Sequence, residues 1–310
     1  MIELRNVRKH YGDVKAVDGV SFTARPGEVF GLIGPNGAGK STTIKMIMNI
    51  LAPDAGEILF DGKRLGRRMK DAIGYLPEER GLYKKVKLGE MLAYLASLKN
   101  AHAGEAARRI DRWLARFDLA EWKNRRCEDL SKGMGQKAQF IAAVAHDPPY
   151  LFLDEPFAGL DPVATDLLRE TVLEMGREGK TILFSTHNME VAERICSRIF
   201  LIDHGREVLS GAMDEVKARY GRNAVLAEFD GELSLAGLSG LAANIIRYPR
   251  YVEIELAPGA SSQELLKALV ARVAVRRFEV ASPSLHKIFV QLVGRGRREG
   301  TPSREGTPNE

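Results

Sequence analysis

Residues 34–42 read Gly34-Pro35-Asn36-Gly37-Ala38-Gly39-Lys40-Ser41-Thr42 and fit the phosphate-binding pattern G-x-x-x-x-G-K-[ST]. An apolar run at residues 29–33 precedes this pattern, and apolar residues at helical spacing follow it from Ile44 to Leu51. A strand that leads into a glycine-rich turn and then into a helix lets backbone N–H groups close around phosphate oxygens. The sequence therefore predicts that residues 34–42, the phosphate loop, bind a nucleoside triphosphate.

Two side chains of the phosphate loop have predicted roles of their own. We expect Lys40 to reach the outer phosphates and the hydroxyl of Ser41 to bind Mg²⁺. The alternative is a glycine-rich loop that matches the pattern by chance. The strand before the loop and the helix after it favour the phosphate-binding interpretation.

Two acidic residues follow a second apolar run further along the chain. Asp154 and Glu155 come directly after residues 150–153, which are typical of a buried strand. In a parallel sheet, the end of this strand would lie at the same edge as the phosphate loop. We therefore expect Asp154 to bind Mg²⁺ and Glu155 to accept a proton from the attacking water. The alternative is a strand followed by a solvated acidic turn.

The overall composition is that of an ordinary globular protein. The 310 residues are 45% apolar and 28% charged, which suffices for two domains. Lysine and arginine number 46 against 41 acidic residues, a mild excess that does not by itself indicate nucleic acid. Cys127 and Cys196 lack metal-ligand spacing and are expected to be buried thiols. Because no stretch approaches the roughly 18 apolar residues that span a bilayer, we expect a cytoplasmic protein that reaches a membrane through a partner.

A third motif narrows the class of nucleotide-binding protein. Residues 130–134 read Leu-Ser-Lys-Gly-Met before a predicted helix at 136–145, and they resemble the signature L-S-G-G-Q of the ATP-binding subunits of ABC transporters. Lys132 replaces the first glycine of that signature, and Met134 replaces the glutamine. Residues 159–162, Gly-Leu-Asp-Pro, resemble the family's D-loop, and residues 185–187, Ser-Thr-His, resemble its switch histidine. These motifs occur in the family's order within the first two thirds of the chain.

The resemblance implies a role for each residue, beside a plain structural one. Ser131 and Gly133 would begin a helix that points at the γ-phosphate held by a second protomer, although Ser131 is also a good helix N-cap. His187 would hydrogen-bond the γ-phosphate or the attacking water, or it is a satisfied histidine at a strand end. Tyr11 would stack on adenine, or it packs at an edge strand. Asp161 would contribute to the nucleotide site through the D-loop and can cap the helix that follows it.

One departure from the family concerns the metal. Glu78 stands where the family usually has a glutamine that contacts Mg²⁺ and links the ATP site to a helical subdomain. A carboxylate can also ligate Mg²⁺, so we expect Glu78 to join Ser41 and Asp154 as a metal ligand; the alternative is that it faces solvent. The surrounding string at residues 77–83, Pro-Glu-Glu-Arg-Gly-Leu-Tyr, resembles a subgroup of bacterial exporter ATPases of the sodium-efflux type.

The predicted elements give an α/β fold with two domains. By the resemblance, residues 1–220 would form a P-loop NTPase core, a mostly parallel sheet with an antiparallel β part. Apolar residues three or four apart predict helices at 88–99 and 103–117, and the resemblance implies that these belong to a helical subdomain at about 82–146. Residues 221–293 predict a small α+β domain, which resembles the accessory domain of the exporter subgroup. Residues 294–310 are rich in Gly, Pro and Arg, and we expect a disordered tail.

The resemblance implies an ATP-hydrolysing subunit of an ABC transporter, in particular an exporter, that uses ATP and Mg²⁺. It would form a head-to-tail dimer with a second copy or a related ATPase subunit, attach to the inner face of the cell membrane through membrane-spanning permease subunits, and bind no nucleic acid.

Three other classes share part of the pattern. A soluble ABC-type ATPase that acts on a ribosome or a nucleic-acid complex would usually carry two such domains or a long coiled-coil insertion. A regulatory subunit without hydrolysis would be expected to lack Glu155 or His187. A GTPase would need a guanine-reading motif such as Asn-Lys-x-Asp, which the sequence lacks.

Overall fold

The chain forms two compact units, and each is described by itself. The computed structural model describes residues 1–79, 81–99, 101–220, 224–230, 238, 240–249, 251–281 and 284–299. The first unit is Met1–Met213, and the second begins at Asp214. The sequence placed this boundary after residue 220, whereas the structure groups helix α7 (Met213–Tyr220) with the second unit from Asp214 onward.

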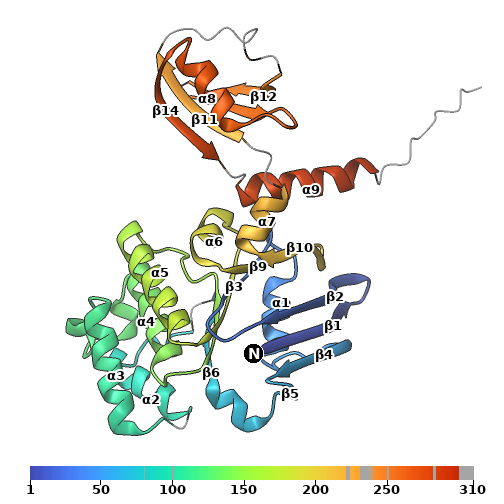
Figure 1. Ribbon diagram of the computed structural model, residues 1–310. Coiled ribbons are helices and arrows are strands. Elements are labelled where there is room, and N and C mark those ends of the chain that lie inside the picture. Colours follow the sequence, from blue (N-terminus) through green and yellow to red (C-terminus); the bar gives the residue numbers. More distant parts are fainter. Residues whose placement is uncertain are drawn as a thin grey trace, which may run out of the picture. The chain divides into compact units, whose positions relative to one another are not determined.

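A mostly parallel sheet lies at the centre of the first unit (Figure 1). Its strands run in the order β10 (Arg206–Ala212), β9 (Arg198–Asp203), β3 (Val29–Ile33), β8 (Thr181–Thr186), β7 (Tyr150–Asp154) and β6 (Ile73–Leu76). All of them run parallel except β10, which pairs antiparallel with β9. Strands β3, β7 and β8 are buried along their whole length, and apolar residues accordingly dominate their sequences, in β8 at residues 182–184.

An antiparallel sheet packs against this central sheet. Its order is β2 (Val14–Ala24), β1 (Ile2–Tyr11), β4 (Ala55–Phe60) and β5 (Lys63–Arg64). The ring of Phe22 stacks on Phe30 with centroids 4.7 Å apart and lies 5.2 Å from the ring of Phe200, which joins the two sheets in one core. The predicted combination of a parallel sheet and an antiparallel β part is confirmed.

The first unit contains two groups of helices, one beside the central sheet and one that forms a helical subdomain. The core helices are α1 (Lys40–Ile47), α5 (Pro162–Arg177) and α6 (Met189–Ile195), with a 3₁₀ segment at Arg67–Ala72. The helical subdomain holds α2 (Leu88–Ser97), α3 (Ala103–Arg116) and α4 (Lys132–Val144), with 3₁₀ turns at Ala120–Trp122 and Cys127–Asp129. The rings of Phe117 and Phe140, 5.4 Å apart, pack α4 against the end of α3.

The second unit is a small α+β fold, as predicted. An antiparallel sheet in the order β12 (Ala242–Arg247), β13 (Val252–Leu256), β11 (Ala224–Asp230) and β14 (Ala274–Ala281) is accompanied by α8 (Ser262–Val270) and α9 (Leu285–Glu299). Ile254 and Leu265, both fully buried, belong to the core of this unit.

The end of α9 corrects one expectation. The predicted disordered tail began at residue 294, but α9 continues to Glu299, so that prediction is wrong for residues 294–299. Arginine and glutamate are good helix formers, and they outweigh the two glycines of this stretch. Residues 300–310 of the predicted tail lie outside the described residues.

Candidate functional site

The phosphate loop connects β3 to α1 along a path that depends on its glycines. Gly39 immediately precedes α1 with a left-handed φ of 109°, and a Cβ there would lie 2.3 Å from the carbonyl oxygen of Ala16. A Cβ on Gly34 would lie 2.1 Å from the carbonyl oxygen of Ile202. Larger residues would therefore displace the loop from the sheet edge. The first N–H groups of α1 have no partner within the helix, so they can be offered to an anion.

Lys40 folds back over the loop that precedes it. Its side chain is buried, and Nζ donates to the carbonyl oxygens of Gly34 (2.8 Å) and Pro35 (3.0 Å). Burial lowers the pKa of Lys40, while the nearby carboxylates of Glu155, Asp154 and Glu78 act in the opposite direction. The ammonium group therefore shares one polar space with all three predicted site acids.

Asp154 ends β7 as a buried carboxylate with a fixed orientation. The residue is 2% exposed, and the hydroxyl of Ser185, at the equivalent position of the neighbouring strand β8, donates to its Oδ1. Because Ser185 is fully buried, this hydrogen bond is shielded from water. The carboxylate is thus held at the carboxyl edge of the sheet, as the sequence predicted.

Glu155 is held by three donors from the end of β8 and the loop after it. Oε1 accepts from the backbone N–H of His187 (2.8 Å) and lies 2.8 Å from its Nδ1, while Oε2 accepts from the hydroxyl of Thr186 (3.1 Å). Glu155 itself has a left-handed φ of 48°, a conformation that costs a non-glycine residue about 1–2 kcal/mol. Strain of this kind clusters at functional sites, and here it turns a nearly buried carboxylate toward His187.

A cavity of about 380 Å³ brings the phosphate loop and the acids together. It is lined by Ala16, Asn36, Gly37, Gly39, Lys40, Ser41, Thr42, Glu78, Asp154 and Glu155. The structure therefore unites the predicted triphosphate loop, the predicted general base and all three predicted metal ligands in one hollow. Glu78 is an exposed residue that borders the cavity, and its role as a metal ligand remains a prediction.

The donor set in this cavity fits Mg²⁺. Among the described residues, no group of three or more His, Cys, Asp or Glu side chains is arranged as an all-protein metal site. The cavity instead offers the hydroxyl of Ser41 and the carboxylates of Glu78 and Asp154. Mg²⁺ keeps several waters, takes few protein ligands and shares substrate phosphate oxygens, which is compatible with this sparse set.

Eight predicted site residues are not among those that line the cavity. Gly34, Pro35 and Ala38 belong to the phosphate loop, and His187 contacts Glu155 beside the cavity. The other four are Tyr11, Ser131, Gly133 and Asp161. Tyr11, at the end of β1, is 52% exposed, and its ring centroid is 5.8 Å from Nζ of Lys9. Ser131 caps α4 by accepting from the backbone N–H of Met134 (3.3 Å), and Gly133 lies in the first turn of that helix. Asp161 caps α5 by accepting from the backbone N–H of Ala164 (2.9 Å). The capping roles of Ser131 and Asp161 are thus observed, and both residues remain exposed.

The start of α4 also differs from its prediction. The helix begins at Lys132 and not at residue 136, because the Ser131 cap compensates for the glycines of the first turn.

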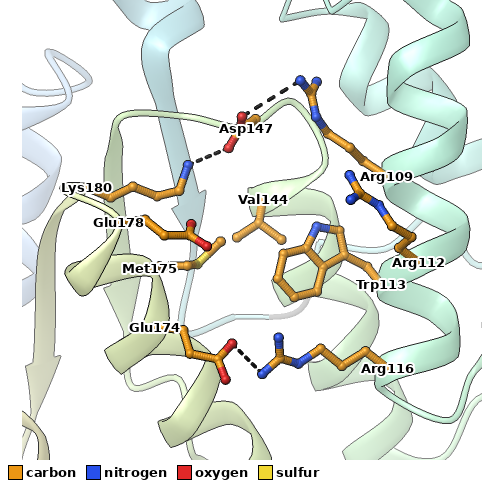
Figure 2. A pocket seen from close by; sticks show the side chains of 10 residues that line it. All are labelled: Arg109, Arg112, Trp113, Arg116, Val144, Asp147, Glu174, Met175, Glu178 and Lys180. Atoms are coloured by element: carbon orange, nitrogen blue, oxygen red, sulfur yellow. Dashed lines mark hydrogen bonds and ion pairs between the residues drawn. The ribbon is translucent and has the colours of Figure 1, made fainter.

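A second cavity, of about 340 Å³, contains none of the predicted site residues (Figure 2). It lies among α3, the end of α4 and α5. Arg116 pairs with Glu174 (2.7 Å), and Asp147 pairs with Lys180 and with Arg109 (3.7 Å). Three of the four cations that line this cavity are thus paired with acids of the same lining.

Sequence reasoning assigned no role to several polar residues around the site. Ser185 and Thr186 directly precede His187 in the Ser-Thr-His motif. Two hydroxyl residues at the end of a buried strand indicate hydrogen bonds to neighbouring polar groups, and this pattern could have identified them. Gln136 and Gln139 are 4% and 5% exposed on α4, where two polar residues three apart interrupt an otherwise buried face. A buried amide in such a pattern indicates a specific hydrogen-bond partner.

Comparisons with known proteins agree with this geometry. The family profile described as "ABC transporter" matches residues 17–158, and the profile "ATP-binding protein DrrA1-3-like, C-terminal domain" matches residues 211–293. The chain is 40% identical to the uncharacterized ABC transporter ATP-binding protein YhaQ of Bacillus subtilis, over 95% of this chain and 99% of the relative. It is 32% identical to the linearmycin resistance ATP-binding protein LnrL of the same organism, over 96% and 100%.

A solved structure shows the same fold. The "Dimeric Structure of MJ0796, a Bacterial ABC Transporter Cassette" matches with a TM-score of 0.63 at 26% identity, over 69% of this chain and 99% of that one. No described helix is long and apolar enough to cross a membrane. The family profile, YhaQ and MJ0796 are described as ABC transporter proteins, and none of these descriptions supports an ATPase of ribosomes or nucleic acid. The chain belongs to the ABC transporter family, as one of its ATP-binding and ATP-hydrolysing subunits.

Proposed function

We propose that this subunit hydrolyses ATP with Glu155 as the general base and that it powers an exporter. The observation that carries the proposal is the fixed carboxylate of Glu155 beside the phosphate loop. Three donors from Thr186 and His187 orient it, and it borders the same cavity as Lys40. A carboxylate in this position can accept a proton from a water that attacks the γ-phosphate.

The other cavity residues would bind and neutralise the triphosphate. The N–H groups of the phosphate loop and the first turn of α1 would hold the phosphates, and Lys40 would exchange its carbonyl partners for phosphate oxygens. Ser41, Asp154 and Glu78 would hold Mg²⁺, which supplies charge neutralisation at the β- and γ-phosphates. With Glu155 ionised, the proton of His187 lies on Nδ1, and this contact keeps the ring beside the base.

A second protomer would complete the site. Ser131 and Gly133 begin α4 on the surface and line no part of their own chain's cavity. The N-terminus of α4 therefore remains available for the γ-phosphate bound by another copy. The dimeric state of MJ0796, whose fold this unit shares, supports a head-to-tail dimer of this chain or of this chain with a related subunit.

The membrane role would come through separate subunits. The relatives are described as ATP-binding proteins of transporters, and LnrL is described by resistance to linearmycin, a phenotype that export explains. We therefore place the chain at the inner face of the cell membrane, bound to permease subunits that carry the substrate outward. Tyr11, exposed at the end of β1, is the proposed platform for adenine.

Two measurements test this proposal. In the purified full chain, removal of Mg²⁺ should stop phosphate release, and Lys40→Ala should lose binding of a fluorescent ATP analogue. Unchanged analogue binding by Lys40→Ala would refute the site. In cells, replacement of the wild type by Glu155→Gln should cause accumulation of the transported compound. Its depletion would instead show an importer.

A further inference from the structure

Two buried glutamines on α4 donate hydrogen bonds to the main chain beside Glu155 and beside Glu78. Nε2 of Gln136 donates to the carbonyl oxygen of Pro156 (3.0 Å), and Nε2 of Gln139 donates to the carbonyl oxygen of Glu79 (3.2 Å). Pro156 directly follows Glu155, and Glu79 directly follows Glu78. Each glutamine thus holds the main chain one residue beyond an acid that borders the cavity.

The spacing of the two glutamines makes this a property of one helix face. Residues three apart on an α-helix are neighbours on its surface, so Gln136 and Gln139 move together with α4. The helix itself belongs to the helical subdomain, where Phe140 packs on Phe117 with ring centroids 5.4 Å apart. A displacement of this subdomain is therefore transmitted to both acid-bearing segments at once.

The backbone around Glu155 has little freedom to absorb such a displacement. The N–H of Glu155 donates to the carbonyl oxygen of Ser185 (3.1 Å), and the next residue, Pro156, has a restricted φ and no N–H. The hydrogen bond from Gln136 fixes the other side of this left-handed turn. Without it, the carboxylate would be oriented only by the end of β8 and the loop after it.

Of the two polar atoms of the Gln139 amide, the NH₂ group has a hydrogen-bond partner and the oxygen has none among the described residues. The Oε1 atom is buried, while Nε2 bonds the Glu79 carbonyl. A buried polar atom without a partner is costly, and an apolar residue of this size would avoid that cost. A glutamine at this position forms a hydrogen bond to the main chain beside Glu78, which an apolar residue cannot form.

We propose that Gln136 and Gln139 are positioning residues that couple the helical subdomain to Glu155 and Glu78, respectively. The proposal rests on the proposed function, because it takes Glu155 as the base and Glu78 as a metal ligand. Gln136 then governs the rate of the chemical step, and Gln139 governs the use of Mg²⁺. Substitution of Gln136 should therefore change kcat, and substitution of Gln139, three residues further along the same helix, should change the Mg²⁺ dependence.

The test replaces each amide by methionine, which keeps the side chain's length but cannot donate. Gln136→Met should lower kcat about 10- to 100-fold and leave the affinity for ATP within about twofold, as for loss of an outer partner that orients a catalytic group. Gln139→Met should raise the Mg²⁺ concentration for half-maximal turnover by about tenfold. Both are measured on the full chain by phosphate release and by equilibrium binding of a fluorescent ATP analogue.

Lys137→Met is the matched control. Lys137 lies between the two glutamines in sequence, and its Nζ donates to the carbonyl oxygen of Phe117 (3.3 Å), within the helical subdomain. Its kcat and its Mg²⁺ dependence should stay within about twofold of the wild type, since this bond reaches no acid-bearing segment. Thermal unfolding shows whether each variant is folded. If Gln136→Met does not fold, Gln136→Asn, which retracts the amide by one carbon, should show the same loss of kcat without loss of ATP affinity.

Two results would overturn the coupling. Equal changes in kcat, ATP affinity and Mg²⁺ dependence in all three methionine variants would show that α4 has only a structural role. Normal kinetics in both glutamine variants would show that the acids keep their places unaided. Glu155→Gln separates this failure from a failure of the proposed function: if it keeps turnover, the assignment of the base is wrong, whereas a loss of turnover in it alone leaves only the coupling refuted.

Discussion

Glu155→Gln removes the proposed base and preserves nearly all of its contacts. The amide oxygen can take the position of Oε1 and accept from the N–H of His187, now 2.8 Å away, and from its Nδ1. The NH₂ group would meet the Thr186 hydroxyl, which lies 3.1 Å from Oε2. The exchange of charge-assisted for neutral hydrogen bonds costs about 1 kcal/mol for each, which the fold of the first unit should tolerate.

The effect on turnover should be far larger than the effect on binding. An amide cannot accept the proton of the attacking water, and loss of a general base lowers the rate about 10²–10⁴-fold, which corresponds to about 3–5 kcal/mol in the barrier. ATP affinity should change little, because the phosphate loop and Lys40 remain intact. Phosphate release in single turnover reports the chemical step, and equilibrium binding of a fluorescent ATP analogue reports affinity.

Lys40→Ala provides the contrast for this experiment. It should lose triphosphate binding itself, since the buried ammonium group is the cavity's cation. Turnover of Glu155→Gln within threefold of the wild type would refute the assignment of the base. A parallel loss of ATP binding in Glu155→Gln and Lys40→Ala would show that Glu155 acts in binding and not in the chemical step.

Three further predictions address Tyr11, Glu78 and His146. Stacking of a base on an aromatic ring contributes about 1–3 kcal/mol, so Tyr11→Ala should weaken ATP affinity about tenfold and Tyr11→Phe hardly at all; equal losses in titrations of both would exclude stacking. Glu78→Gln should keep activity but need more Mg²⁺, because an amide oxygen can occupy the same metal site, and unchanged Mg²⁺ titrations of Glu78→Gln and Glu78→Ala would place the residue outside it. Burial lowers the pKa of His146 to about 4. The unfolded state then binds more protons between about pH 4 and pH 6.5, so the free energy of unfolding should fall as pH is lowered through this range. Urea titrations should show a flatter pH dependence for His146→Gln, and an unchanged slope would exclude His146 as the cause.

The parts of the site that depend on local sequence could be predicted. The phosphate loop has its own turn chemistry, and a strand that ends in two acids has only one edge at which to place them in a parallel sheet. The structure accordingly brings Lys40, Asp154 and Glu155 around one cavity. The left-handed conformation of Glu155 could not be predicted, since it arises from contacts with the end of β8 and the loop after it.

Other features depend on long-range contacts that no local pattern specifies. Gln136 and Gln139 lie on a helix whose apolar spacing was visible, but their partners are backbone carbonyls 20 and 60 residues away in sequence. The end of α9 at Glu299 follows the helix propensity of the arginines and the glutamate in residues 294–299, whereas the two glycines there favour a chain without helix. The proposed composite site between two chains is supported by the exposed start of α4 and by the family resemblance.

The most direct test of the account asks whether two chains share one ATP site. Ser131→Arg would block the start of α4 while leaving its own phosphate loop intact, and Lys40→Ala would disable the loop while leaving its α4 intact. Each variant alone should be nearly inactive, and a mixture should regain part of the lost ATPase activity through one composite site. Specific activity of the wild type should also rise with protein concentration until dimers saturate. The assay is repeated with the permease subunits present, so that a native partner other than a second copy is included. Activity that is independent of concentration, with no recovery on mixing in either setting, would show that each chain hydrolyses ATP alone and would contradict the account.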